Sequence, residues 1–330
     1  MMGEAAHAIS HDPVFMTLGL NTAVSLAGAG FAAAQKQAVI GVFTKNFTNP
    51  AYDAFRIGAD KIAKAANARV IHYVPKKPDD VDEQTAQIEQ ALIDKPDIVI
   101  FTPVNDKAMV GPVKKLNDAN IPIVLFTNPL PGKFVTYVGS DDVELGYQEA
   151  VYLFKHMGGK GRIVVIEGVP AAPTNRDRLR GYQRAFAEFP GIQVLASGVG
   201  NYLRTKAREV MGQMLKDHAE IDAALVANDS MSLGVLEALK AANRTTVIAS
   251  INGILEAVKE VESGKILATA DFNTFKMACL ATQAALRHLK GEKLPEKIML
   301  PAEIIDKTNY KAWLVPVADR PCPKWEDYVR

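Results

Sequence analysis

The sequence contains few cysteines and carries almost no net charge. Its 330 residues include two cysteines, Cys279 and Cys322, which are too few for a disulfide-rich scaffold or a four-cysteine zinc site. With 38 Lys and Arg against 37 Asp and Glu, the net charge is +1, so composition gives no electrostatic reason to expect a nucleic-acid partner. Hydrophobic residues make up 48% and charged residues 23%, as in an ordinary folded protein, and the length predicts about two domains.

The motifs of common enzyme classes are also missing from the sequence. It has no G-x-x-x-x-G-K-[ST] phosphate loop, no G-x-G-x-x-G after its first strand, no G-x-S-x-G and no H-E-x-x-H. Its six histidines are scattered, without the spacing of metal ligands. We therefore expect no catalytic residue, no metal site and no cofactor. The two cysteines would be free to pair in an oxidising compartment, but the sequence leaves this open because it gives no distance between them.

The N-terminal region contains a stretch without charge, from Val14 to Ala34. Such a stretch is typical of a membrane span or of the apolar part of a secretory signal peptide. Its glycines, and the small residues at 32–34 that match an A-x-A cleavage site, favour a signal peptide over residues 1–34. The residues before the stretch include two acidic and no basic ones, so an uncleaved anchor is the alternative. Cleavage after Ala34 would leave 330 − 34 = 296 residues.

From residue 37 onward, short apolar runs rich in β-branched residues alternate with helical patterns. We expect strands at 37–43, 69–74, 97–101, 121–126, 134–138, 162–167, 192–197, 223–227, 246–251 and 266–270. Helices are expected at 51–66, 81–93, 107–119, 143–157, 178–189, 205–218, 230–242, 254–262 and 275–289, before an extended tail. Apolar strands alternating with helices indicate parallel βαβ units that are buried on both faces. Because one open sheet rarely holds so many strands, we predict an α/β fold with two lobes.

An Asn-Asp pair occurs twice, each time near the end of an expected strand where a helix begins. Asn105-Asp106 comes shortly after the run DIVIF, and Asn228-Asp229 comes directly after DAALVA. Asp is a good residue for the N-cap of a helix. We therefore expect each Asp to cap the helix that follows it.

Polar and aromatic side chains are concentrated at the expected strand ends, where ligands bind in open α/β sheets. Asn offers a donor and an acceptor from one side chain, as hydroxyl groups require, and aromatic rings bury the apolar C–H faces of a sugar ring. The combination suits a polyhydroxylated ligand, although strand ends are polar in folds without ligands as well. The segments concerned are 45–52, 102–106, 127–128, 176, 202, 228–229, 252 and 271–272.

Several short motifs carry a resemblance to a known family. They are Asn49-Pro50-Ala51-Tyr52, NIPIV at 120–124, GSDD at 139–142, RDR at 176–178 with Gly181-Tyr182, ANDSMSLG at 227–234, and Ile251-Asn252-Gly253. In this order and spacing, they resemble the ribose-binding-protein-like family, the type I periplasmic solute-binding proteins of ABC sugar importers. Asn-Pro alone is only a turn signal, so the resemblance depends on the whole set.

The resemblance implies two Rossmann-like lobes with parallel sheets, joined by a three-segment hinge, that close on a sugar by hinge bending. It places the first lobe at 35–140 and 272–302 and the second lobe at 141–271 and 303–330. Carried over position by position, the ligand-binding residues would be Lys45, Asn49, Ala51, Tyr52, Thr127, Asn128, Arg176, Tyr202, Asn228, Asn252 and Phe272. From the residues alone, Arg176, Arg178 and Arg180 could instead form a solvated basic face, and the tyrosines could be packing residues.

Part of this set departs from the ribose pattern. The positions that depart are Ala51, Thr127, Asn128, Asn252 and Phe272. Two carboxylates that would accept hydrogen bonds from hydroxyls are replaced, whereas Arg176 is kept and Lys45 is added. Because a guanidinium can hold a carboxylate in a bidentate pair, the ligand could be a sugar acid, or else a less hydroxylated polyol. The alternative is a neutral sugar, with Asp271 balancing the charge of Arg176.

The resemblance implies a periplasmic, monomeric receptor that captures a small carbohydrate and delivers it to an ABC transporter permease with its ATPase. A periplasmic sensor that presents its ligand-bound form to a chemoreceptor or sensor kinase is the alternative. A transcriptional regulator with the same fold would need an N-terminal helix-turn-helix domain, whereas the first expected strand already begins at residue 37.

Overall fold

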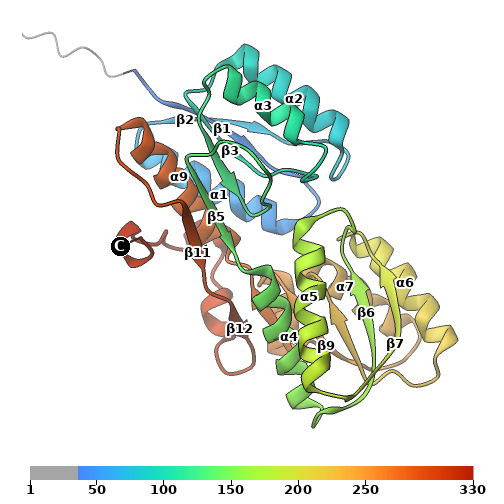
Figure 1. Cartoon of the computed structure of the whole chain (residues 1–330). Coiled ribbons are helices and arrows are strands. Elements are labelled where there is room, and N and C mark those ends of the chain that lie inside the picture. Colours follow the sequence, from blue (N-terminus) through green and yellow to red (C-terminus); the bar gives the residue numbers. More distant parts are fainter. Residues whose placement is uncertain (1–35, 330) are drawn as a thin grey trace, which may run out of the picture. The chain divides into compact units, whose positions relative to one another are not determined.

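The computed structural model describes residues 36–329, in which strands and helices alternate (Figure 1). The expected signal peptide at 1–34 lies outside these residues. Among the described residues, no helix combines the length and the apolar character that crossing a membrane requires. The helices are α1 (Pro50–Ala65), α2 (Val81–Asp94), α3 (Val110–Asp118), α4 (Asp142–His156), α5 (Pro173–Glu188), α6 (Arg204–Asp217), α7 (Asp229–Ala241), α8 (Leu255–Ser263) and α9 (Thr274–Leu289).

The first sheet combines strands from the first part of the chain with one strand from near its end. Its order is β11-β5-β4-β3-β1-β2, and neighbouring strands are parallel throughout. The strands are β1 (Val39–Phe43), β2 (Arg69–Tyr73), β3 (Ile98–Phe101), β4 (Ile123–Phe126), β5 (Thr136–Ser140) and β11 (Lys297–Leu300). Every residue of β3 and β4 is buried, as expected for strands with helices on both faces.

The second sheet has the order β12-β10-β9-β8-β6-β7. Its strands are β6 (Lys160–Glu167), β7 (Gly191–Val199), β8 (Ala223–Val226), β9 (Val247–Ile251), β10 (Ala268–Asp271) and β12 (Glu303–Ile305). The pairs are parallel except that β12 runs antiparallel to β10. The sequence places β11 and β12 in an extended tail, because these short edge strands lack a continuous apolar run.

Helices cover both faces of each sheet (Figure 1). In the first sheet, α1 and α9 pack on one face and α2 and α3 on the other. In the second sheet, α6, α7 and α8 pack on one face and α4 and α5 on the other. The prediction of an α/β fold with two lobes is therefore confirmed, and each sheet with its helices is called the first or the second lobe below.

Three connections of the described chain run between the two sheets: the one after β5, the one after β10, and the short link from β11 to β12. They correspond to the three segments expected for the hinge. Two of them lead directly into helices, α4 in the second lobe and α9 in the first. The residues at these points therefore lie between a strand of one lobe and a packed helix of the other.

The C-terminal tail differs from the prediction that residues 303–330 belong to the second lobe. The 3₁₀ turn Tyr310–Trp313 packs against α8 of the second lobe. The next turn, Val317–Asp319, instead contacts α1 of the first lobe. Cys322 then forms a disulfide with Cys279 of α9, so the pairing that the sequence leaves open is present. The prediction is wrong for the end of the tail because a covalent bond fixes it to the first lobe.

The expectation that the two Asp residues cap helices is also wrong. In the second lobe, Asn228 caps α7, because its Oδ1 accepts a hydrogen bond from the backbone N–H of Met231 at 2.9 Å. In the first lobe, Asn105 accepts hydrogen bonds from two backbone N–H groups of the turn before α3. In each pair it is the Asn that accepts these backbone hydrogen bonds, although only Asn228 is the N-cap of a helix, since α3 begins after Met109 without a side-chain cap. Both Asp side chains are left for other contacts.

Candidate functional site

A small cavity, of about 30 Å³, lies at the carboxyl ends of strands from both lobes. The residues that line it are Lys45, Asn46, Asn49, Ala51, Tyr52 and Asp79 of the first lobe, and Thr174, Arg178, Tyr202, Asn228, Asn252 and Phe272 of the second lobe and the hinge. The walls come from both lobes, so the cavity exists only while the lobes are close together.

The first-lobe wall is built by the loop between β1 and α1. The buried ammonium of Lys45 lies 2.8 Å from Oδ1 of Asp79, and the Asn46 side chain donates a hydrogen bond to Oδ2 of the same carboxylate. Asn46 in turn accepts from the backbone N–H of Asn49, and Asn49 caps α1 by accepting from the N–H of Ala51. These bonds fix the loop and leave the charge of Lys45 balanced.

The second-lobe wall is organised by Arg178, which is 2% exposed. Its Nε donates to Asp142 at 2.8 Å and its Nη1 to the backbone oxygen of Ala227 at 2.5 Å. The guanidinium also lies 4.9 Å from the ring centre of Phe272 and 5.9 Å from that of Tyr202. Burial raises the pKa of Asp142 to about 6, while the charge of Arg178 acts in the opposite direction.

Two asparagines supply polar atoms to the cavity that the described part of the protein leaves unbonded. The Oδ1 of Asn228 is used in capping α7, whereas its buried Nδ2 donates to no described residue. Asn252 likewise has a buried Oδ1 without a donor among residues 36–329. A buried polar group without a partner costs about 1–3 kcal/mol. The pair therefore offers one donor and one acceptor to a hydroxylated ligand.

Three aromatic rings complete the cavity: those of Tyr52, Tyr202 and Phe272. Burial raises the pKa of the Tyr52 and Tyr202 hydroxyls above the ordinary value, so both remain neutral and can donate hydrogen bonds. The Tyr202 hydroxyl lies 3.1 Å from that of Thr174. Rings beside hydroxyl and amide groups match the alternating apolar and polar surface of a small carbohydrate.

Most of the residues that the resemblance implies as ligand-binding come together at this cavity. They are Lys45, Asn49, Ala51, Tyr52, Tyr202, Asn228, Asn252 and Phe272. The structure does not bring Thr127, Asn128 or Arg176 to its wall.

Arg176 points away from the cavity to the surface. Its Nη2 donates to Asp106 of the first lobe at 2.5 Å, and its Nη1 donates to the backbone oxygen of Ala171 at 2.8 Å. Residues two positions apart on a helix point to nearly opposite sides, so Arg176 and Arg178 cannot both face the ligand. The Arg176–Asp106 ion pair joins the lobes at the surface instead.

Thr127 and Asn128 follow β4, but the chain turns away from the cavity there. Thr127 has a φ of 57°, and its backbone oxygen accepts from the hydroxyl of Tyr137 at 2.7 Å. The Nδ2 of Asn128 donates to the backbone oxygen of Pro103 at 2.9 Å. These bonds hold the loop after β4 against neighbouring loops of the first lobe.

The ligand-binding set that the resemblance implies lacks four residues of the cavity: Asn46, Asp79, Thr174 and Arg178. Arg178 belongs to the same RDR motif as Arg176, and the helical phase was the signal that could have separated the two. Pro173, at the first position of α5, marks the true start of that helix, five residues before the expected one. Asp79 carries no comparable signal, because it lies in the loop before α2 and reaches Lys45 only through the fold.

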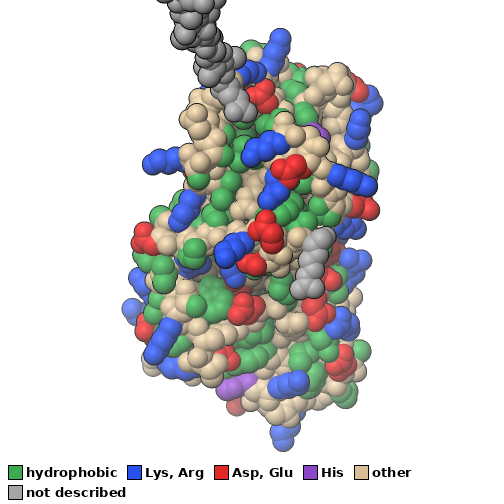
Figure 2. Space-filling model, turned by 90° about the vertical axis from the view of Figure 1, so that its left-hand side faces the viewer, with side chains coloured by type: hydrophobic (Ala, Val, Ile, Leu, Met, Phe, Trp, Pro, Cys, Tyr) green, Lys and Arg blue, Asp and Glu red, His purple; other side chains and the backbone are tan. Residues whose placement is uncertain are grey.

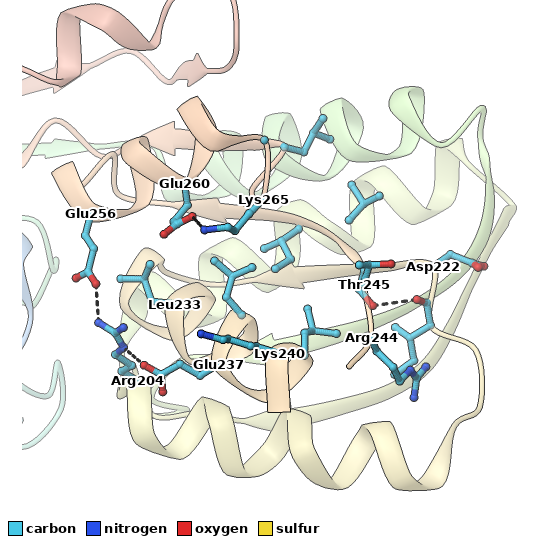
Figure 3. Close-up of a pocket in the computed structure, with 18 of the residues that line it drawn as sticks. Arg204, Asp222, Leu233, Glu237, Lys240, Arg244, Thr245, Glu256, Glu260 and Lys265 are labelled. Carbon is cyan, nitrogen blue, oxygen red and sulfur yellow. Dashed lines mark hydrogen bonds and ion pairs between the residues drawn. The ribbon is translucent and has the colours of Figure 1, made fainter. Parts of the chain in front are cut away.

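A larger hollow, of about 1000 Å³, lies in the second lobe between α7 and α8 (Figure 3). Its rim is occupied by ion pairs, which join Arg204 to Glu237 and Glu256, and Lys265 to Glu260. The hollow lies away from the lobe-to-lobe cavity, and its rim acids are bonded within the protein. We assign no ligand to it.

The face shown in Figure 2 and the titratable groups of residues 36–329 give no indication of a site for a metal or a polyanion. On the face shown in Figure 2, basic and acidic side chains are interspersed. Within residues 36–329, no group of three or more His, Cys, Asp or Glu side chains is arranged to hold a metal ion. The lobe-to-lobe cavity therefore remains the strongest candidate for a binding site.

Comparison with known proteins gives the same picture. A family model described as a periplasmic binding protein domain matches residues 40–293. The ribose import binding protein of Bacillus subtilis is 28% identical over 271 residues, which cover 82% of this chain and 88% of that protein. The xylitol-binding protein of Mycolicibacterium smegmatis is 31% identical over 261 residues, 76% of this chain and 72% of that protein.

A solved structure shows the same fold. The periplasmic solute-binding protein of an ABC transporter from Actinobacillus succinogenes, with bound D-allose, aligns with a TM-score of 0.79 and 28% identity, covering 83% of this chain and 99% of that one. These relatives are binding proteins and not enzymes, in agreement with the expectation from sequence. The chain therefore belongs to the periplasmic binding protein family.

Proposed function

We propose that this protein captures a small, neutral sugar or polyol between its lobes and delivers it to the permease of an ABC importer. The observation that carries the proposal is the pair of buried, unbonded amide atoms of Asn228 and Asn252 beside the three aromatic rings. Relatives named for ribose, xylitol and D-allose support the ligand class. The family supports a periplasmic location, and the proposed route there is export through the signal peptide at 1–34, followed by action as a monomer.

The charges at the cavity favour a neutral ligand over a sugar acid. Lys45 is paired with Asp79, and Arg178 with Asp142, so the described residues leave no spare positive charge there. Arg176, the cation that suggested a sugar acid from sequence, is paired with Asp106 at the surface. A carboxylate in the cavity would have to compete with an acidic side chain for each buried cation.

Capture requires the lobes to move apart and close again. The cavity is enclosed by both lobes, and the Arg176–Asp106 ion pair joins them on the outside. A ligand of several heavy atoms can enter only when the connections between the sheets bend and widen the gap. The hydrogen bonds of the ligand to Asn228 and Asn252 would then stabilise the closed form.

The ligand class can be tested with a thermal-shift and calorimetric panel on residues 35–330. Ribose, xylitol, D-allose and the sugar acid D-ribonate are the probes. We expect at least one neutral probe to raise the melting temperature as its concentration rises, since at 100 times its Kd a ligand stabilises by about 2.7 kcal/mol. D-ribonate should have no effect. Stronger stabilisation by D-ribonate than by any neutral probe would contradict the proposal.

A variant sharpens the test of charge balance. Asp79→Asn should leave Lys45 without its anionic partner and shift the preference toward D-ribonate by about ten-fold, because charged hydrogen bonds are the stronger ones. Asn is tolerated at the φ of 57° that Asp79 adopts. The control is Asp80→Asn, since Asp80 caps α2 and Asn caps equally well. An unchanged preference in Asp79→Asn would contradict the charge argument.

A further inference from the structure

The C-terminal segment 306–329, called the strap below, is attached to both lobes. At its start, Asp306 accepts a hydrogen bond from the Tyr152 hydroxyl of α4 at 2.7 Å. Trp313 is 9% exposed and packs with Val258 and Ile305 of the second lobe. Farther along, Cys322 is bonded to Cys279 of α9, in the first lobe. The strap therefore adds a link between lobes that are already joined by the hinge.

Hydrogen bonds shorten the part of the strap that runs between its contacts with the two lobes. The Lys61 ammonium of α1 donates to the backbone oxygens of Ala318 and Arg320, at 3.0 and 2.6 Å. The Arg320 guanidinium donates back to the oxygens of Val315 and Trp313, at 2.9 and 2.6 Å. Even with the Arg320 bonds broken, the five Cα–Cα steps from Trp313 to Ala318, which Lys61 holds, could span at most about 18 Å. The first lobe is thus tied through Arg320 to Trp313 on the second.

Trp313 also reaches the ligand cavity indirectly. Its indole N–H donates to Asp271 at 2.7 Å, and the other oxygen of that carboxylate accepts from the backbone N–H of Asn273 at 2.7 Å. Asp271 thereby fixes the turn where the chain passes from β10 to α9. Phe272, in the middle of this turn, lines the cavity and faces Arg178 at 4.9 Å. Burial raises the pKa of Asp271 to about 6, and the Trp313 donor counteracts that rise.

We propose that the strap limits the separation of the two lobes and, through Trp313 and Asp271, holds Phe272 in place at the cavity, so that ligand affinity depends on the strap and its disulfide. The affinity part rests on the proposed function. If the hinge is less restrained, open forms are more populated. The apparent affinity is the intrinsic affinity multiplied by the fraction of molecules that are competent to close, so it falls as that fraction falls. Trp313 is a positioning residue in this scheme and does not touch the ligand.

The experiment compares two perturbations of the strap by two readouts. Trp313→Phe keeps an aromatic ring and removes the N–H donor, and reduction of the wild-type disulfide loosens the anchor without any substitution. Small-angle X-ray scattering gives the radius of gyration of the unliganded protein, and calorimetry gives the Kd for xylitol, ribose and D-allose. We expect each perturbation to increase the radius of gyration and to raise the Kd. For Trp313→Phe the rise should be about five-fold, the effect of losing one buried hydrogen bond.

Trp325→Phe is the matched control, because Trp325 lies over Arg287 of α9, at 4.8 Å, on the first lobe. It should change neither readout. The proposal is overturned if Trp313→Phe and reduction leave the radius of gyration and the Kd unchanged, or if Trp325→Phe has the same effect. Should the wild type bind none of the three probes, the proposed function fails, and the radius of gyration alone decides whether the strap holds the lobes.

Discussion

The two Asn-Asp pairs occupy corresponding places in the two lobes and act differently. β3 and β8, which precede them, each stand fourth in the order of their sheets. In the first lobe, Asn105 holds a turn and Asp106 reaches outward to Arg176. In the second lobe, Asn228 caps α7 beside the cavity, and Asp229 is fully buried beneath it.

The difference between the pairs lies in burial, since the residue types are the same. Asp229 accepts hydrogen bonds from the hydroxyls of Ser250 and Thr269 and from the backbone N–H of Ile254. It thereby ties together the ends of β9 and β10 and the start of α7, so the second-lobe wall is rigid. Asp106 has a charged partner at the surface, where an ion pair can break and form as the lobes move. One lobe contributes a fixed wall and the other a reversible contact.

The largest effect is expected from Asp229→Asn. In the wild type, one carboxylate oxygen of Asp229 accepts a hydrogen bond from the backbone N–H of Ile254. An amide NH₂ group in that place would face another donor, so we expect a loss of about 3 kcal/mol in the free energy of unfolding, measured by urea denaturation. Asp106→Asn should lose less than about 1 kcal/mol. Equal losses in the two variants would remove the contrast between the lobes.

The stability lost in Asp229→Asn should depend on pH, and the direction of that dependence follows from the pKa of Asp229. Burial raises the pKa of Asp229 above 3.8, so the folded state binds this proton more tightly than the unfolded state. Its contribution to stability is therefore present at low pH and declines as the pH rises above 3.8. The deficit of Asp229→Asn should be larger at pH 4.5 than at pH 7.5, and a deficit that grows with pH would contradict this.

An intermediate effect is expected from Asn228→Asp. The carboxylate can still cap α7 but has no N–H to offer the ligand, so the Kd should rise at least about ten-fold. Because a charge is then placed on a side chain that is 1% exposed, the free energy of unfolding should also fall. Calorimetry with the neutral probes measures the Kd. The matched variant Asn105→Asp in the first lobe should leave the Kd unchanged. Binding of wild-type strength in Asn228→Asp would exclude the amide as a ligand contact.

The smallest effect is expected from the surface ion pair. Arg176→Met should raise the Kd about two-fold at low salt, and the difference from wild type should vanish at high salt because exposed charges are screened. Arg180→Met is the control, since Arg180 pairs with Asp177 on its own helix. A difference that persists at 1 M salt would show that Arg176 acts by something other than charge.

The alternation of strands and helices could be predicted because buried parallel strands leave an apolar signature. Residues directly after these strands, such as Asn252 and Phe272, could also be placed, because strand ends meet at one edge of a sheet. The choice between Arg176 and Arg178 depends on where α5 begins, and helix boundaries are poorly determined by sequence. Asp79 and the strap could not be placed, because their partners, Lys45 and Cys279, are distant in sequence.

The unbonded amide atoms of Asn228 and Asn252 have a consequence for the fidelity of transport. Closing the lobes without a ligand would bury both atoms without a partner, at about 1–3 kcal/mol each, whereas ligand hydroxyls remove that cost. The closed form is therefore populated mainly when a ligand fills the cavity. A permease that accepts only the closed form would seldom engage an empty receptor, and fewer ATP molecules would be hydrolysed without moving a ligand.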